Sequence, residues 1–120
     1  HPDWCLHSAG RARPTMRGQL ALDMALPDVR DYLFARLDAL LRDNAIAYLK
    51  WDHNRDLFPT APRQTEGFYA LLEALRTAHP HVEIESCSSG GGRIDFGVLS
   101  RIHRVWPSDN NDAIERLRIM

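Results

Sequence analysis

Two stretches of the chain carry apolar residues three and four positions apart, which is the spacing of one helix face. The first runs from Pro27 to about Asn44, and Pro27 suits the first position of a helix. The second follows Thr65, which the pattern predicts as an N-cap. A last helix follows Asp112, with Glu115 three residues later in the manner of a capping box. We therefore predict three helices.

Three other stretches have the pattern of strands. Residues 45–51 (AIAYLKW) are short and largely apolar, which predicts a buried strand, and residues 81–86 (HVEIES) alternate with period two. Residues 101–106 (RIHRVW) are a third candidate, and the serine- and glycine-rich residues 88–92 predict a turn before it. The order is helix, strand, helix, strand, short connection, strand, helix. This alternation predicts the α/β class, with a parallel sheet wrapped by helices.

Polar side chains stand at the end of each predicted strand. In parallel α/β folds, and above all in the (β/α)8 barrel, the carboxyl ends of the strands face the active site. We therefore expect these side chains to belong to an active site. They are Lys50, Asp52 and Asn54 after the first strand, Cys87, Ser88 and Ser89 after the second, and Ser108, Asp109 and Asn110 after the third.

Composition narrows the class of protein. The chain has 120 residues, 44 % hydrophobic and 26 % charged, which is typical of one globular domain. Its formal net charge of -1 gives no reason to expect a nucleic acid or an anionic membrane as partner. No apolar run approaches the roughly 18 residues that span a bilayer. Cys5 and Cys87 lie far apart without a CxxC motif, which favours a reduced, cytoplasmic compartment.

Other chemistries fit the sequence less well. The glycine run lacks the Lys-Ser or Lys-Thr of a P-loop, and His1, Asp3 and His7 lack the spacing of metal ligands, so we expect neither a metal nor a cofactor. Asp52 could also be a turn residue or pair with Lys50. Two strand-end carboxylates without these motifs suggest glycoside hydrolysis, in which retaining enzymes hold a nucleophile and an acid and base roughly 5 Å apart. Local spacing leaves this as one option among several.

Longer motifs are more specific. The stretches YLKWDHNR, CSSGGGRIDFG and WPSDNNDAIERLRI resemble those of the α-galactosidases of glycoside hydrolase family 36, and HPDW and RGQLALD are similar to that family as well. The resemblance covers essentially the whole chain in the right order. It implies a partial (β/α)8 TIM barrel in which residues 1–120 are a fragment of the catalytic domain, from about the end of strand 3 to the start of helix 6. Because the chain begins at His1 without an initiator methionine and stops within a helical pattern, we also expect an internal piece of a longer protein.

The resemblance also implies an activity and its residues. The enzyme would cleave terminal α-galactosides of the melibiose or raffinose type by double displacement, with Asp52 as nucleophile and Asp109 as general acid and base. Lys50 would donate to sugar hydroxyls and keep Asp52 ionised. The aspartates that grip the galactose O4 and O6 would lie upstream of this chain, and the full-length protein is expected to be a homo-oligomer. The implied substrate-binding residues are Arg17, Lys50, Trp51, Asn54, Cys87, Ser88, Ser89 and Gly90.

Three alternatives stay open at this point. A galactosyltransferase of the raffinose- or stachyose-synthase type would use the same double displacement and pass the sugar to another sugar, although the CSSGGGR motif favours the hydrolase. An α-N-acetylgalactosaminidase would share the fold. A truncated, catalytically inactive sugar-binding fragment is the alternative outside the enzyme class.

Overall fold

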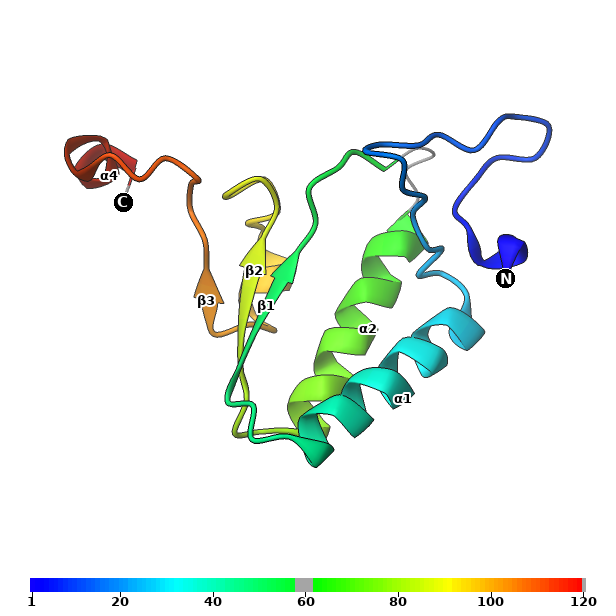
Figure 1. The fold of residues 1–120 in the computed structure, drawn as a ribbon, viewed down its shortest axis with the longest axis horizontal. Helices are drawn as coiled ribbons and strands as arrows, with labels where there is room; N and C mark the ends of the chain where they lie inside the picture. The colour runs from blue at the N-terminus through cyan, green and yellow to red at the C-terminus, as the bar shows by residue number, and fades with distance from the viewer. Residues whose placement is uncertain (58–61, 120) are drawn as a thin grey trace. The chain divides into compact units, whose positions relative to one another are not determined.

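The computed structural model describes residues 1–57 and 62–119, which fold into helices and a small parallel sheet (Figure 1). Two compact units are present: His1–Ala45 with Asp56–His79, and Ile46–Arg55 with Pro80–Met120. The elements in chain order are the 3-10 helix η1 (Pro2–Trp4), α1 (Pro27–Asp43), β1 (Tyr48–Asp52), α2 (Pro62–Ala78), β2 (Glu83–Cys87), α3 (Phe96–Leu99), β3 (Arg104–Val105) and α4 (Ala113–Ile119).

The first unit is built on α1 and α2, which pack against each other (Figure 1). The predicted start of α1 at Pro27 is confirmed, and the Asn44 amide donates to the Leu40 carbonyl at 2.8 Å at its other end. The predicted N-cap Thr65 is wrong, because α2 already includes Pro62, whose fixed φ suits a first helical turn. The buried apolar residues of the two helices are Val29, Leu41, Phe68, Leu71, Leu72 and Leu75.

Two residues of α2 hold the segment that precedes α1. The buried Gln64 side chain accepts the Met24 N–H at 2.6 Å and donates to the Leu22 carbonyl at 2.9 Å. A Cβ at Gly67 would collide with the Met24 carbonyl, so only glycine lets the two backbones approach this closely. The residues before α1 are therefore fixed on α2 by one amide and one glycine.

The second unit carries the predicted parallel sheet, with strand order β1-β2-β3 (Figure 1). The register runs from Tyr48 opposite Glu83 to Asp52 opposite Cys87, so β1 starts and ends later than the apolar pattern predicts. β3 is only two residues long, because residues 101–103 of the predicted strand form a turn and irregular backbone, and the short helix α3 lies in the connection before them. The pairing of backbone groups, and not the apolar run, sets these bounds.

The expected burial of the first strand is wrong. Residues of β1 alternate between exposed and half-buried, and Tyr48 is 45 % exposed, whereas β2 is buried over four of its five residues. The reason is position: β2 lies between two strands, while β1 pairs with one strand within the described residues. An apolar stretch indicates that a strand can be buried, but it does not show whether neighbouring strands are present to bury it.

The sequence pattern missed α3 and was partly right about α4. Asp95 caps α3 by accepting the Val98 N–H at 2.8 Å. Asp112 caps α4 as predicted, accepting the Glu115 N–H at 2.9 Å. The reciprocal half of the capping box is wrong, because Glu115 pairs with Arg118 at 2.9 Å and Asn110 accepts the Asp112 N–H. In residues 1–57 and 62–119, no helix is both long and apolar enough to cross a membrane.

Candidate active site

The polar ends of β1 and β2 lie side by side in the second unit. Asp52 and Cys87 are the last residues of the two strands and stand opposite each other in the register. The Asn54 amide donates to the Asp52 carboxylate at 2.7 Å, and the Cys87 thiol hydrogen-bonds to the same carboxylate. This places a carboxylate with two side-chain donors at the carboxyl edge of the sheet.

The charge of Asp52 is set by these neighbours. Burial alone would raise the pKa of Asp52, but hydrogen bonds from Asn54 and Cys87 and the positive charge of Lys50 together lower that pKa below its ordinary value. Burial raises the pKa of the Cys87 thiol, so this group stays protonated and remains a donor. At neutral pH the site therefore holds an ionised, exposed carboxylate.

The loop after β2 is hydrogen-bonded to the two residues that follow this carboxylate. The Ser88 hydroxyl donates to the His53 carbonyl at 2.6 Å, and the Ser89 N–H donates to the Asn54 side chain at 2.7 Å. Ser89 and Gly90 have φ of 47° and 84°, the left-handed region that a serine seldom adopts. Asn54 therefore bridges the Asp52 carboxylate and a strained loop.

Gly90 brings this loop against the segment that follows β3. A Cβ at Gly90 would lie 2.8 Å from the Ser108 Cα and 3.2 Å from the Pro107 carbonyl oxygen. The first distance is too short for a side chain and the second is tight, so with its positive φ glycine is the residue that this approach requires. The strand-end segments of β2 and β3 consequently meet directly beside Asp109.

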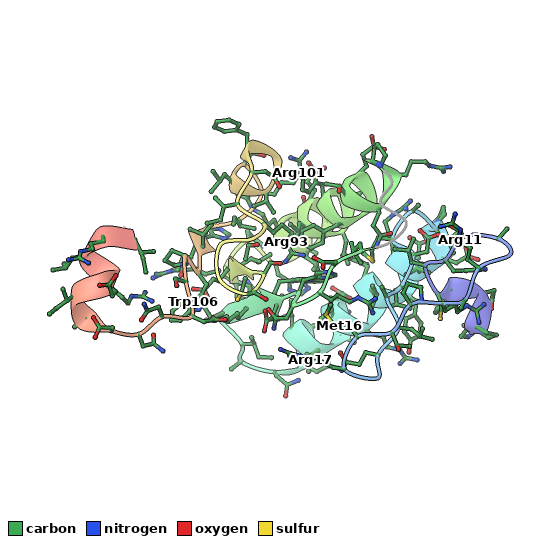
Figure 2. The ribbon with its side chains drawn as sticks, turned by 90° about the horizontal axis from the view of Figure 1, so that it is seen from above. Arg11, Met16, Arg17, Arg93, Arg101 and Trp106 are labelled. Carbon is green, nitrogen blue, oxygen red and sulfur yellow. The ribbon has the colours of Figure 1, made fainter. Side chains whose placement is uncertain are left out.

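Lys50 and Trp106 lie between the strand ends. The Lys50 ammonium is 4.1 Å from the centre of the Trp106 ring and 3.4 Å from a carboxylate oxygen of Glu85. The indole N–H of Trp106 donates to the Asp109 carboxylate at 2.7 Å. Figure 2 shows Trp106 between β3 and α4. The surroundings of Asp52 and Asp109 are thus joined through one lysine and one tryptophan.

Arg93, Trp106 and His53 belong to this site, although the sequence pattern did not single them out. The Arg93 guanidinium donates to the carbonyls of Trp51 and Cys87, each at 3.4 Å, and so ties β1 to β2 where they end (Figure 2). Burial, and then the charge of Arg93, lower the pKa of His53, so its ring is neutral at neutral pH. The one sequence signal that could have pointed to these residues is the position of Arg93 within the glycine-rich motif.

Two predicted binding residues, Trp51 and Arg17, make no contact that supports their predicted roles among the contacts described above. The Trp51 side chain lies on the opposite face of β1 from Lys50 and Asp52, because successive residues of a strand alternate. Arg17 belongs to the first unit, at the tip of a turn in which Met16 and Gln19 exchange backbone hydrogen bonds of 3.2 and 3.0 Å. The binding roles of both residues stay predictions.

A metal site has no support in the described part of the chain. Among residues 1–57 and 62–119, no group of three or more histidine, cysteine, aspartate and glutamate side chains could hold a metal ion. Cys5 and Cys87 are both free.

Parallel strands whose carboxyl ends carry carboxylates and a glycine-rich loop are typical of α/β enzymes. The family model described as Melibiase matches residues 1–120. The chain therefore belongs to the melibiase family, and its resemblance to the α-galactosidases of glycoside hydrolase family 36 is confirmed.

Individual relatives agree. The chain is 50 % identical over 126 residues to an α-galactosidase of Escherichia coli, a match that covers 99 % of this chain and 18 % of that protein. The structure matches the α-galactosidase AgaA of Geobacillus stearothermophilus with a TM-score of 0.89 at 39 % identity, covering 99 % of this chain and 18 % of AgaA. A variant of AgaA solved in complex with raffinose gives the same values. The strands and helices described here match part of that enzyme's fold.

Proposed function

We propose that residues 1–120 form a fragment, from about strand 3 to the start of helix 6, of the (β/α)8 catalytic domain of a retaining α-galactosidase. Its substrates are terminal α-galactosides of the melibiose or raffinose type. The observation that carries this proposal is the carboxylate of Asp52, kept ionised by Asn54, Cys87 and Lys50 at the end of β1. The family match and the raffinose bound to an AgaA variant support the substrate class.

In the first step, Asp52 attacks the anomeric carbon of the galactose. A bond forms between its carboxylate oxygen and that carbon, while the bond from the carbon to the leaving oxygen breaks. Asp109 gives its proton to the departing oxygen, so the aglycone leaves as a neutral alcohol. The hydrogen bond from the Trp106 indole, at 2.7 Å, orients Asp109 for this transfer.

In the second step, water releases the sugar. The ionised Asp109 takes a proton from the water, whose oxygen bonds to the anomeric carbon as the ester bond to Asp52 breaks. Two inversions leave the product with the configuration of the substrate. This double displacement requires the two carboxyl groups to stand roughly 5 Å apart across the scissile bond, a separation that stays a prediction.

The test uses paired variants of the complete enzyme that contains this chain. Asp52→Ala should lower turnover by several orders of magnitude, because no galactosyl-enzyme can form. Added azide should then restore activity and give a galactosyl azide of inverted configuration. In Asp109→Ala, azide should attack the intermediate itself and give the azide of retained configuration.

Two further results complete the assignment. Asp109→Ala should slow raffinose far more than p-nitrophenyl α-galactoside, because only a basic leaving oxygen needs a proton. Asp112→Ala, which removes the cap of α4, is the matched control and should give no azide product. Near-normal turnover in Asp52→Ala, or the same azide anomer from both catalytic variants, would overturn the proposed roles.

A further inference from the structure

One face of the sheet carries a row of charged and polar side chains below Asp52. Lys50 stands opposite Glu85 in the register of β1 and β2, and Glu85 stands opposite Arg104 in the register of β2 and β3. Because side chains two residues apart share a face, Lys50, Glu85 and Asp52 lie on the same side of the sheet. This face of the sheet is therefore polar, in contrast to the apolar faces of the helices α1 and α2.

Glu85 is the most enclosed member of this row. Its side chain is 10 % exposed, whereas that of Lys50 is 39 % exposed. A carboxylate this deep is costly unless it is paired, and the Lys50 ammonium lies 3.4 Å from its oxygen. Tyr48 adds a second partner: desolvation of its hydroxyl, and then its hydrogen bond to Glu85, raise the pKa of Tyr48 to about 12, so the phenol remains a donor.

Lys50 is held from two sides. Glu85 lies on one side, and the Trp106 ring lies 4.1 Å from the ammonium on another, a cation–π contact. A lysine has a long, flexible stem, so an ammonium that must stay beside Asp52 needs such anchors. Of these two contacts, the one with Glu85 joins opposite charges. Because the Glu85 carboxylate is nearly buried, turning it away from Lys50 would cost it this ion pair.

We propose that Glu85 is a positioning residue for the proposed reaction, because it fixes the Lys50 ammonium beside Asp52 and against Trp106. The inference rests on the proposed α-galactosidase function. In this role Glu85 need not contact the sugar or the reacting atoms, because its contacts are with Lys50 and Tyr48. It acts through Lys50, which stands two residues before Asp52 on the same strand face.

The chain supplies a matched control in Glu83. This glutamate lies two residues earlier on β2, on the same face, and its carboxylate pairs with Arg104 at 2.7 Å. Its side chain is 46 % exposed, and it stands opposite Tyr48 and not opposite Lys50. Glu83→Gln therefore removes one negative charge from the same face without touching the anchor of Lys50.

The experiment is a double-mutant cycle on the complete enzyme with p-nitrophenyl α-galactoside, whose good leaving group keeps slow variants measurable. Glu85→Gln should lower kcat/KM by about 10- to 100-fold, since displacing a catalytic group by about 1 Å has effects of this size. In the Lys50→Met background the same change should lower kcat/KM by less than about twofold, because Glu85 can no longer act through Lys50. Glu85→Asp, which keeps the charge, should recover part of the loss, and Glu83→Gln should stay within about twofold of the parent.

Thermal unfolding of each variant separates positioning from folding. If Glu85→Gln does not fold, the same cycle run with Glu85→Asp decides the matter. Equal activity of the Glu85→Gln and Glu83→Gln enzymes, or a loss that persists undiminished in the Lys50→Met background, would overturn the proposal. A complete parent enzyme without α-galactosidase activity would instead refute the proposed function, so the two failures are distinguishable.

Discussion

The Asp52 carboxylate shows how a few side chains set the charge of one residue. Its two side-chain hydrogen-bond donors are of different kinds, because the Asn54 amide cannot titrate, while the Cys87 thiol stays protonated as a result of its burial. Lys50 adds a positive charge from the same strand face. All three neighbours stabilise the ionised form, which is the form that a nucleophile requires.

A change at Asn54 should therefore be visible in the pH dependence of activity. Asn54→Ala removes a donor to the ionised carboxylate, so the pKa of Asp52 should rise. Since the reaction needs Asp52 ionised, activity is lost as the pH falls through this pKa, and a higher pKa moves the loss to higher pH. The acid limb of kcat/KM against pH, measured on the complete enzyme, checks this shift.

Asn44→Ala is the control for that measurement. Asn44 closes the end of α1 through the Leu40 carbonyl, and it lies in the first unit. Its replacement should leave the acid limb where it is in the parent enzyme. An Asn54→Ala profile that also coincides with the parent would show that Asn54 does not tune Asp52.

At the scale of elements, the loop after β2 joins the ends of all three strands. Ser88 and Ser89 bind the segment after β1, and Gly90 approaches Ser108 in the segment after β3. Ser89 adopts a backbone conformation that costs on the order of 1 kcal/mol. Such strain at a strand end is common where a loop must hold a site in one geometry.

Gly90→Ala should damage this loop. The new Cβ would lie 2.8 Å from the Ser108 Cα, and the φ of 84° disfavours any side chain. The loop must then retreat, and we expect kcat/KM of the complete enzyme to fall on the order of 10- to 100-fold. Steady-state kinetics with p-nitrophenyl α-galactoside measure the loss.

Gly10→Ala separates collision from backbone strain. Gly10 has a φ of 74°, close to that of Gly90, but a Cβ built there would have no atom of the described residues within 4 Å apart from Gly10 and its two chain neighbours. The Gly10→Ala enzyme should lose about 1 kcal/mol of stability from backbone strain alone, and should keep kcat/KM within about twofold of the parent. Equal kinetic losses in the two variants would mean that the approach to Ser108 does not matter.

At the scale of the whole molecule, the chain leaves backbone and apolar surface uncovered. β1 and β3 each pair with one strand within the described residues, so each has a free edge. Large apolar side chains are exposed in the same unit, with Phe96 at 93 %, Leu117 at 83 % and Ile114 at 66 %. The chain spans 18 % of the length of its Escherichia coli relative, and a complete (β/α)8 barrel takes about 250 residues.

The 120-residue chain alone should therefore have no measurable α-galactosidase activity and should associate with itself. Open edges and apolar faces favour association, and the rest of the proposed substrate site is missing. Size-exclusion chromatography and an assay with p-nitrophenyl α-galactoside check both points. A soluble monomer that turns over about once per second or faster would show that the fragment interpretation is wrong.

A chimaera gives the positive control. Inserted in place of the matched segment of the Escherichia coli α-galactosidase, with which it shares 50 % identity, the chain should support activity. Asp52→Ala in that chimaera should abolish it. If the chimaera is active and Asp52→Ala leaves that activity unchanged, the proposed role of Asp52 is wrong, although the family match still stands.

The sequence by itself determined the features that depend on neighbouring residues. Helix positions, the cap at Asp112 and the alternation of strands and helices follow from spacing and local hydrogen bonding, so α1, α4 and the parallel sheet could be predicted. The motifs around Asp52 and Asp109 identified the family, because a catalytic site uses specific residues in a fixed order.

The tertiary structure decided what depends on partners far away in the chain. The bounds of β1 follow from its pairing with β2, and its exposure follows from its place at the sheet edge. The contacts of Lys50 with Glu85 and Trp106 bring together residues 35 and more positions apart, which no local pattern encodes. Electrostatic and packing interactions act through space, so the surroundings of Asp52 and the inferred role of Glu85 became visible only once the strands were aligned.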